Sequence, residues 1–354
     1  MNKIRDTTID VSKALGIILI VFGHSGLLFT NYVYLFHVPL FFIISGYFFI
    51  NNIDLPILSL LKKLFKNLVL PYYLYSLFFL LFHYYFISIG ILNPQDSKLY
   101  GISFVNDLFV GIKSIFFLDQ TEALLSTFWF ITILFWINIF FMLLVKLLNK
   151  NLIIISITVV LFYCLSGINI RHEIVNLNFN YGNYNVTFTS SLFFLSGIII
   201  NKFNLLRIVN LKLVIGSGFS LFLINKIFRP EIDLRINLYP NIFLLLLQSF
   251  MGLIIIYYLS GLISKFRIAK VYLDYIGKNT LIILALHFLS FKVVTFIQIK
   301  IYKMPIELLS NFNLLVVNNY WRLLYLVYGL LIPILIKLSY DYLRKKIVCR
   351  YQLL

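Results

Sequence analysis

The chain of 354 residues contains only two cysteines, Cys164 and Cys349. Cys164 lies in an apolar stretch and Cys349 in a basic C-terminal segment, so we do not expect the two thiols to pair. The sequence also has no cysteine or histidine spacing that is typical of a metal site. We therefore expect neither a disulfide framework nor a bound metal.

Sequence motifs of several enzyme classes are also missing. There is no G-x-S-x-G nucleophile elbow, no P-loop, no G-x-G-x-x-G fingerprint and no H-E-x-x-H zinc motif. None of the five histidines is followed at the fifth position by an aspartate, which argues against the motif of soluble-type phospholipid acyltransferases.

Charged residues are scarce, at 12% of the chain, whereas hydrophobic residues make up 61%. The hydrophobic residues form long apolar runs that recur from end to end of the chain, and these runs predict an all-α, polytopic membrane protein. We expect about ten transmembrane helices in one domain covering 1–354, with no separate soluble domain. The first run lacks a small-x-small cleavage site and is expected to be retained. The expected spans are 11–30, 34–51, 68–92, 124–148, 152–170, 187–201, 211–227, 240–263, 273–299 and 322–340.

Acidic residues are few, 13 against 30 lysines and arginines, which gives a net charge of +17. In a soluble protein this excess would suggest nucleic-acid binding. Here most basic residues fall in loops that face the cytoplasm if both termini are cytoplasmic, as the positive-inside rule requires. We therefore expect a multi-pass protein of the plasma membrane that contacts anionic lipids and no nucleic acid.

The first span carries two titratable groups, Lys13 and His24. Such groups are costly in a bilayer and call for a functional explanation. Eleven residues are almost three helical turns, so the side chains share a face and lie roughly 16 Å apart along the axis. This arrangement is expected if two substrates meet from opposite sides of the membrane. The structural alternative for Lys13 is a topogenic cation that reaches the interface.

Three of the five histidines, His24, His37 and His287, lie in or near the outer halves of spans. A neutral imidazole can take a proton from a hydroxyl and return it later, which suits acyl transfer to an alcohol. A hydrogen-bonded packing role is the alternative for each of them. Three histidines at similar depth favour a shared site.

Two further groups of residues are candidates for substrate contacts. Lys62, Lys63 and Lys66 precede the third span and suit a pyrophosphate arriving from the cytosol, although they also fit an ordinary positive-inside flank. Trp129, in Thr127–Phe130, is either part of an aromatic belt or a wall on which a sugar stacks. Asn279, in the segment Gly277–Thr280 that leads to His287, is expected to bind substrate.

The order and spacing of these residues resemble the large membrane-bound acyltransferase family three, which O-acetylates bacterial surface sugars. The more specific blocks are Arg5 with Asp10, Lys13–Ile17 through Val21–His24, and Phe36–Phe42 to Ser45–Tyr47. The weaker blocks are Lys63 to Pro71–Tyr72, Phe128–Phe130, and Gly277–Thr280 to Leu286–His287. Lysine at position 13, where family members often have arginine, resembles the fucose 4-O-acetylase branch.

The resemblance implies an O-acyltransferase with acetyl-CoA as the donor. Lys13, and with it Lys63 and Lys66, would hold the phosphates of acetyl-CoA. His24 would act as general base on a hydroxyl of an extracytoplasmic or lipid-linked glycan, and an acetyl-imidazole on His24 is the other mechanism left open. His287 and His37 would orient the acceptor or polarise the acyl carbonyl.

Two alternatives remain open from the sequence. A polysaccharide or lipid-linked sugar transporter would also contain intramembrane charges, although the paired broken helices typical of many transporters are not evident. The second alternative is a different acyltransferase architecture in which His287 is the single catalytic histidine.

Overall fold

A computed structural model of the chain describes residues 7–93, 104–120, 122–172, 184–312, 314–315 and 318–351. Within these ranges the regular structure is helical, and the only β-type pairing described there is an isolated bridge between Asp233 and Leu238. The predicted all-α fold is confirmed.

Ten of the described helices carry the apolar runs of the predicted spans. They are α1 (Thr7–His24), α3 (His37–Phe49), α5 (Leu70–Ser88), α7 (Trp129–Leu147), α8 (Leu152–His172), α9 (Tyr184–Lys202), α10 (Leu211–Phe228), α11 (Ile242–Ile263), α13 (Thr280–Tyr302) and α14 (Asn319–Tyr351). The shorter helices are α2 (Thr30–Tyr34), α4 (Ile57–Leu64), α6 (Phe104–Phe116) and α12 (Arg267–Lys278). Single turns are η1 (Ile50–Asn52), the π-helical η2 (Phe65–Val69), η4 (Ala123–Phe128), η5 (Leu205–Ile208), η6 (Leu234–Ile236) and η7 (Ile306–Leu309).

Among the residues that the structure describes, seven helical segments are long and apolar enough to cross a membrane, so the protein is a polytopic membrane protein. They are Thr30–Asn52, Ile57–Ser88, Ala123–Leu147, Leu211–Phe228, Ile242–Ile263, Thr280–Tyr302 and Asn319–Lys346. The other three predicted spans fall on α1, α8 and α9, and the total of ten stays a prediction.

The boundary of one predicted span was wrong. The stretch 273–299 is not a single helix, because the chain breaks at Asn279 between α12 and α13. The Asn279 amide donates a hydrogen bond to the Tyr275 carbonyl at 2.8 Å, and this contact closes the end of α12. The amphipathic α12 therefore precedes the spanning α13 as a separate element.

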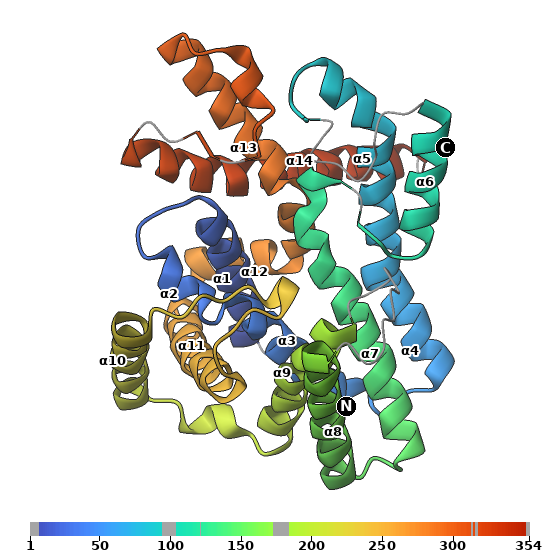
Figure 1. Cartoon of the computed structure of the whole chain (residues 1–354), viewed down its shortest axis with the longest axis vertical. Coiled ribbons are helices and arrows are strands. Elements are labelled where there is room, and N and C mark those ends of the chain that lie inside the picture. The colour runs from blue at the N-terminus through green and yellow to red at the C-terminus, as the bar shows by residue number, and fades with distance from the viewer. Residues whose placement is uncertain are drawn as a thin grey trace.

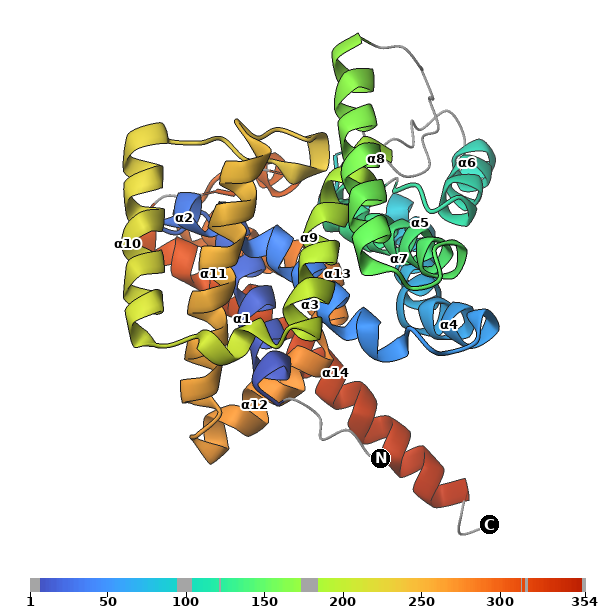
Figure 2. The same ribbon diagram turned by 90° about the horizontal axis from the view of Figure 1, so that it is seen from below.

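The arrangement places α1 near the centre of the molecule, beside α12, with α10 and α11 on one side and α5, α6 and α7 on the other (Figure 1). In the view turned by 90°, the axes of α8, α9, α10 and α11 are roughly parallel (Figure 2). The start of α1, α12 and the last turns of α14 lie at one side of the molecule, and the connection between α10 and α11 lies at the opposite side. The first turn of α1 and the last turns of α14 therefore lie at the same side, and the cytoplasmic assignment of this side stays a prediction.

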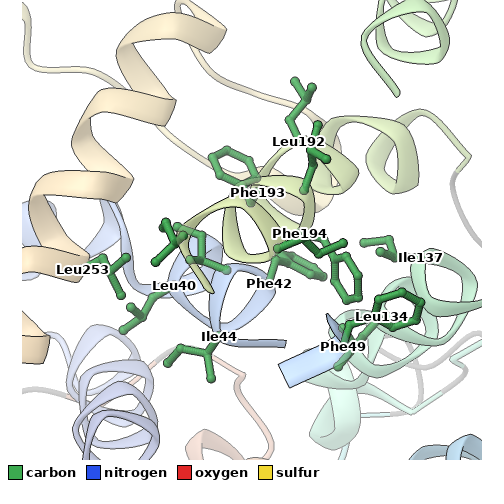
Figure 3. Packing of buried hydrophobic residues seen from close by; sticks show 14 of the residues in the cluster. Leu40, Phe42, Ile44, Phe49, Leu134, Ile137, Leu192, Phe193, Phe194 and Leu253 are labelled. Carbon is green, nitrogen blue, oxygen red and sulfur yellow. The ribbon is translucent and has the colours of Figure 1, made fainter. Parts of the chain in front are cut away.

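The largest core packs α3 against α9, where the ring centroids of Phe49 and Phe194 lie 5.4 Å apart and Phe42 and Phe193 belong to the same cluster (Figure 3). Two glycines allow this close approach. A Cβ at Gly46 would lie 1.9 Å from the Phe194 carbonyl oxygen, and one at Gly197 would lie 1.9 Å from that of Ile43. Small residues at a helix crossing let two backbones touch in a membrane protein. This packing holds α3, and hence His37 at its first position, in place.

Candidate active site

Three histidines from three different helices meet beside the last turn of α1. His24 ends α1, His37 begins α3, and His287 lies two turns into α13. The rings of His24 and His287 are 5.5 Å apart between centroids. The Tyr34 ring lies 4.8 Å from that of His37 and 6.4 Å from that of His24. The structure thus brings the three predicted histidines into one cluster, hereafter the histidine cluster.

Backbone hydrogen bonds determine which nitrogen of His287 carries the proton. Its Nδ1 lies 3.1 Å from the Ile283 carbonyl oxygen and 3.0 Å from that of Leu284. A carbonyl can only accept, so Nδ1–H donates and Nε2 of the neutral ring keeps a lone pair. Nε2 is buried and has no hydrogen-bond partner among the described residues. His37 has the same arrangement, because its Nδ1 donates to the Val33 carbonyl at 2.8 Å.

Thr127 supports this arrangement from a neighbouring element. Its hydroxyl donates to the Leu284 carbonyl at 3.0 Å, the same oxygen that accepts from His287. The residue before η4 is also anchored, since Oε1 of the buried Glu122 lies 2.9 Å from Nδ1 of the buried His83. Glu122 therefore anchors the start of η4, and Thr127 anchors its end. The Thr127 contact also holds the Leu284 carbonyl, which orients His287.

The three histidines differ in exposure. His37 and His287 are buried, whereas His24 is half-buried. Phe288 covers one side of the pair, with its ring centroid 5.0 Å from His24 and 4.2 Å from His287. His24 is therefore the most exposed member of the histidine cluster.

A polar cavity of about 490 Å³ lies near the other end of α1, hereafter the inner cavity. Lys13 and Lys63 both line it. Lys13 Nζ lies 3.9 Å from Asp10 and 4.1 Å from the centre of the Phe48 ring. Lys63 Nζ donates to Oδ1 of Asn52 at 2.7 Å. Two cations in one cavity can bind a phosphorylated ligand.

The helix α1 links the inner cavity with the histidine cluster. Lys13 and His24 lie in this one helix, as the sequence predicted, roughly 16 Å apart along its axis. Ser45 also lines the inner cavity and lies in α3, the helix that begins at His37. Two helices therefore run from the inner cavity to the histidine cluster.

A second polar cavity, of about 690 Å³, lies beside Tyr34 and is hereafter the outer cavity. Residues near the start of the chain and the segment between α10 and α11 form it together. Its lining is Asn31, Tyr32, Tyr34, Asn225, Lys226, Arg229, Pro230, Glu231, Ile232, Asp233 and Leu238. Two acidic and two basic side chains give this lining no net formal charge. Because Tyr34 contacts both His24 and His37, the outer cavity lies one side chain away from the histidine cluster.

Three other predicted site residues lie elsewhere. Lys66 is exposed in η2 and is not part of the inner cavity lining. Trp129 begins α7 half-buried, and it packs against the core that contains Phe42. Asn279 lies at the start of α13, about 12 Å along the helix from His287. Arg5 lies outside the described residues.

Three features of this site were not predicted from the sequence, namely Tyr34, the outer cavity and Lys292. Lys292 is buried in α13, five residues after His287, and its ammonium binds backbone carbonyls. A single lysine inside the apolar run Phe291–Val294 is a signal that could have identified it. The outer cavity had no such signal, because its residues come from α2 and from the end of α10 with the segment after it, which are distant in sequence.

Comparison with known proteins identifies a family for this chain. The family model described as an acyltransferase domain (Acyl_transf_3) matches residues 6–338, nearly the whole chain. Comparison with curated proteins and with solved structures found no match. The matched range includes both cavities and the histidine cluster. The chain therefore belongs to the Acyl_transf_3 family of membrane acyltransferases.

Proposed function

We propose that this protein moves an acetyl group from cytosolic acetyl-CoA to a hydroxyl of an extracytoplasmic or lipid-linked glycan, at the plasma membrane. The observation that carries the proposal is α1, which has Lys13 in a polar cavity near one end and His24 against His287 at the other. We further propose that the chain belongs to a branch like the fucose 4-O-acetylases, on the basis of lysine at position 13.

The inner cavity would hold the donor. Lys13 and Lys63 offer two ammonium groups to the phosphates of CoA, and Asn52 already hydrogen-bonds Lys63 within the same cavity. Lys66 is exposed in the adjacent η2 and does not line the inner cavity, so it would contact CoA phosphates only outside this cavity. The acetyl-bearing arm would extend along α1 toward His24.

The reaction then needs one base and one leaving group. His24, the accessible histidine, would take the proton of the acceptor hydroxyl as its oxygen attacks the thioester carbonyl. The C–S bond breaks, a C–O ester bond forms, and the CoA sulfur leaves with a proton. A ring N–H of His24 directed at the unpartnered Nε2 of His287 would leave the other His24 nitrogen unprotonated, as a general base requires.

The outer cavity would hold the acceptor. Its amides, phenols and balanced charges offer both donors and acceptors to a polyhydroxylated molecule, and Tyr32 and Tyr34 add aromatic faces. Its contact with the histidine cluster through Tyr34 would bring an acceptor hydroxyl toward His24. Trp129 and Asn279 stay predictions as substrate-binding residues.

The test compares cells that express the wild type or His24→Ala at matched membrane abundance. Base-labile acetyl groups on surface and lipid-linked glycans are measured by mass spectrometry. We expect His24→Ala to abolish the acetylation that the wild type adds. Unchanged acetylation, with altered amounts of exported glycan, would contradict the proposal and favour the transporter, which the family membership does not favour.

A further inference from the structure

Lys292 forms an unusual set of contacts for a lysine inside an apolar helix. Its side chain is buried, and Nζ lies 2.8 Å from the Leu309 carbonyl oxygen, 3.3 Å from that of Ser310 and 2.8 Å from that of Asn311. An ammonium group has three N–H donors, so three backbone carbonyls can satisfy it. Burial of this charge in a membrane protein is costly without such partners.

The carbonyls belong to a segment that folds back along α13. Lys292 lies ten residues, roughly 15 Å of helix, before α13 ends at Tyr302. The chain must therefore reverse direction after Tyr302 for residues 309–311 to reach Lys292. We call the described residues 309–312 and 314–315 the strap.

The strap is attached at further points next to the histidine cluster. The Phe312 ring lies 5.0 Å from that of Phe288, which itself contacts His24 and His287. A Cβ at Gly26, two residues after His24, would lie 3.5 Å from Leu314. The Leu315 carbonyl accepts a hydrogen bond from the Tyr325 hydroxyl at 3.2 Å. The strap thus covers the Phe288 side of the histidine cluster.

Irregular backbone is tolerated within a membrane protein only where its polar groups are satisfied. The Lys292 ammonium donates hydrogen bonds to three consecutive carbonyls of the strap. These carbonyls in turn offset the desolvation of the buried ammonium. Each arrangement would be costly without the other. Lys292 is therefore placed to hold the strap closed.

We propose that Lys292 is a positioning residue that holds the strap over His24 and His287, and that the closed strap keeps water from the acyl group during transfer. This inference rests on the proposed acyl transfer. In the productive reaction the acceptor hydroxyl replaces CoA on the acetyl carbonyl. If water enters instead, the same C–S bond breaks and the products are acetate and CoA, with no acetylated acceptor.

The first test asks whether Lys292 holds the strap. Hydrogen exchange of residues 305–315 is measured by mass spectrometry for the full-length wild type, Lys292→Met and Lys300→Met. Lys300 is an exposed lysine of the same helix and serves as the matched control. We expect faster exchange in Lys292→Met only, and partial protection in Lys292→Arg, which keeps hydrogen-bond donors.

The second test asks whether the strap excludes water. The purified proteins receive acetyl-CoA without any acceptor, and released CoA and acetate are quantified by chromatography. We expect Lys292→Met to raise this hydrolysis several-fold over wild type and Lys300→Met. Phe312→Ala loosens the strap without removing a buried charge, and it should have the same effect even where Lys292→Met does not accumulate.

The outcomes separate the strap from the proposed function. Equal exchange in wild type and Lys292→Met would show that Lys292 does not hold the strap, whatever the activity. Faster exchange with unchanged hydrolysis in Lys292→Met and Phe312→Ala would refute the water barrier. A wild type that transfers no acetyl group to any glycan would refute the proposed function and the barrier with it, while the exchange result would still decide the role of Lys292.

Discussion

His24 and His287 come from opposite ends of the chain, yet their rings lie 5.5 Å apart and are tilted by 31° to each other. Two backbone carbonyls hold the proton of His287 on Nδ1, so Nε2 of the neutral ring is unprotonated and keeps its lone pair. One ring is half-buried and the other fully buried. This difference lets the two histidines take different parts in one proton transfer.

We predict that the histidine pair acts as a unit. His24→Ala should lower kcat for acetyl transfer by about 10²–10⁴-fold, the usual contribution of a positioned base. His287→Ala should also lower kcat, and the double variant should lose little more than His24→Ala, since residues of one catalytic unit are not additive. Activity is measured at matched membrane abundance. A fully active His24→Ala with an inactive His287→Ala would instead identify His287 as the single catalytic histidine.

Lys13 should act on donor binding. Lys13→Ala should raise KM for acetyl-CoA by about tenfold, equivalent to about 1.4 kcal/mol of lost charge-assisted hydrogen bonding. Lys13→Arg keeps the charge and should retain most of the affinity. The measurement is initial rate against acetyl-CoA concentration, with the exposed Lys212→Ala as a control. A KM unchanged in Lys13→Ala would limit Lys13 to a topological role.

The outer cavity should control acceptor affinity. Tyr32 lines this cavity, and Tyr32→Ala should raise KM for the acceptor about three- to tenfold through the loss of one aromatic face. Hydrolysis of acetyl-CoA without acceptor should not change. Leu28→Ala, which alters an exposed side chain outside the lining, is the control. A change in the KM for acetyl-CoA alone would indicate that Tyr32 contacts the donor and not the acceptor.

The crossing of α3 and α9 should tolerate no added methyl group. Gly46→Ala and Gly197→Ala each place a Cβ 1.9 Å from a carbonyl oxygen, and we expect a loss of about 1–3 kcal/mol of stability from overpacking. Thermal unfolding in detergent measures this as a lower Tm. Gly218→Ala in α10 meets nothing within 4 Å and should leave Tm unchanged or raise it. An equal Tm in all three variants would contradict the close packing.

The sequence predicted the helices well, because apolar runs of spanning length have few alternatives to a helix in a bilayer. It also placed Lys13 and His24 on one helix, since their spacing depends only on helical geometry. The contact of His24 with His287 depends on tertiary packing of α1 against α13, which no local pattern encodes. The break at Asn279 was missed because the apolar character of α13 extends the hydropathy signal back into α12.

In the proposed function, α1 connects a donor on one side of the membrane with an acceptor on the other. The most direct test supplies acetyl-CoA to membrane vesicles of known orientation, either inside-out or right-side-out, and locates the acetylated glycan. We predict transfer only when acetyl-CoA faces the Lys13 side, with the product on the opposite side. Product formed on the same side as acetyl-CoA, or transfer in both orientations from external acetyl-CoA, would contradict the account.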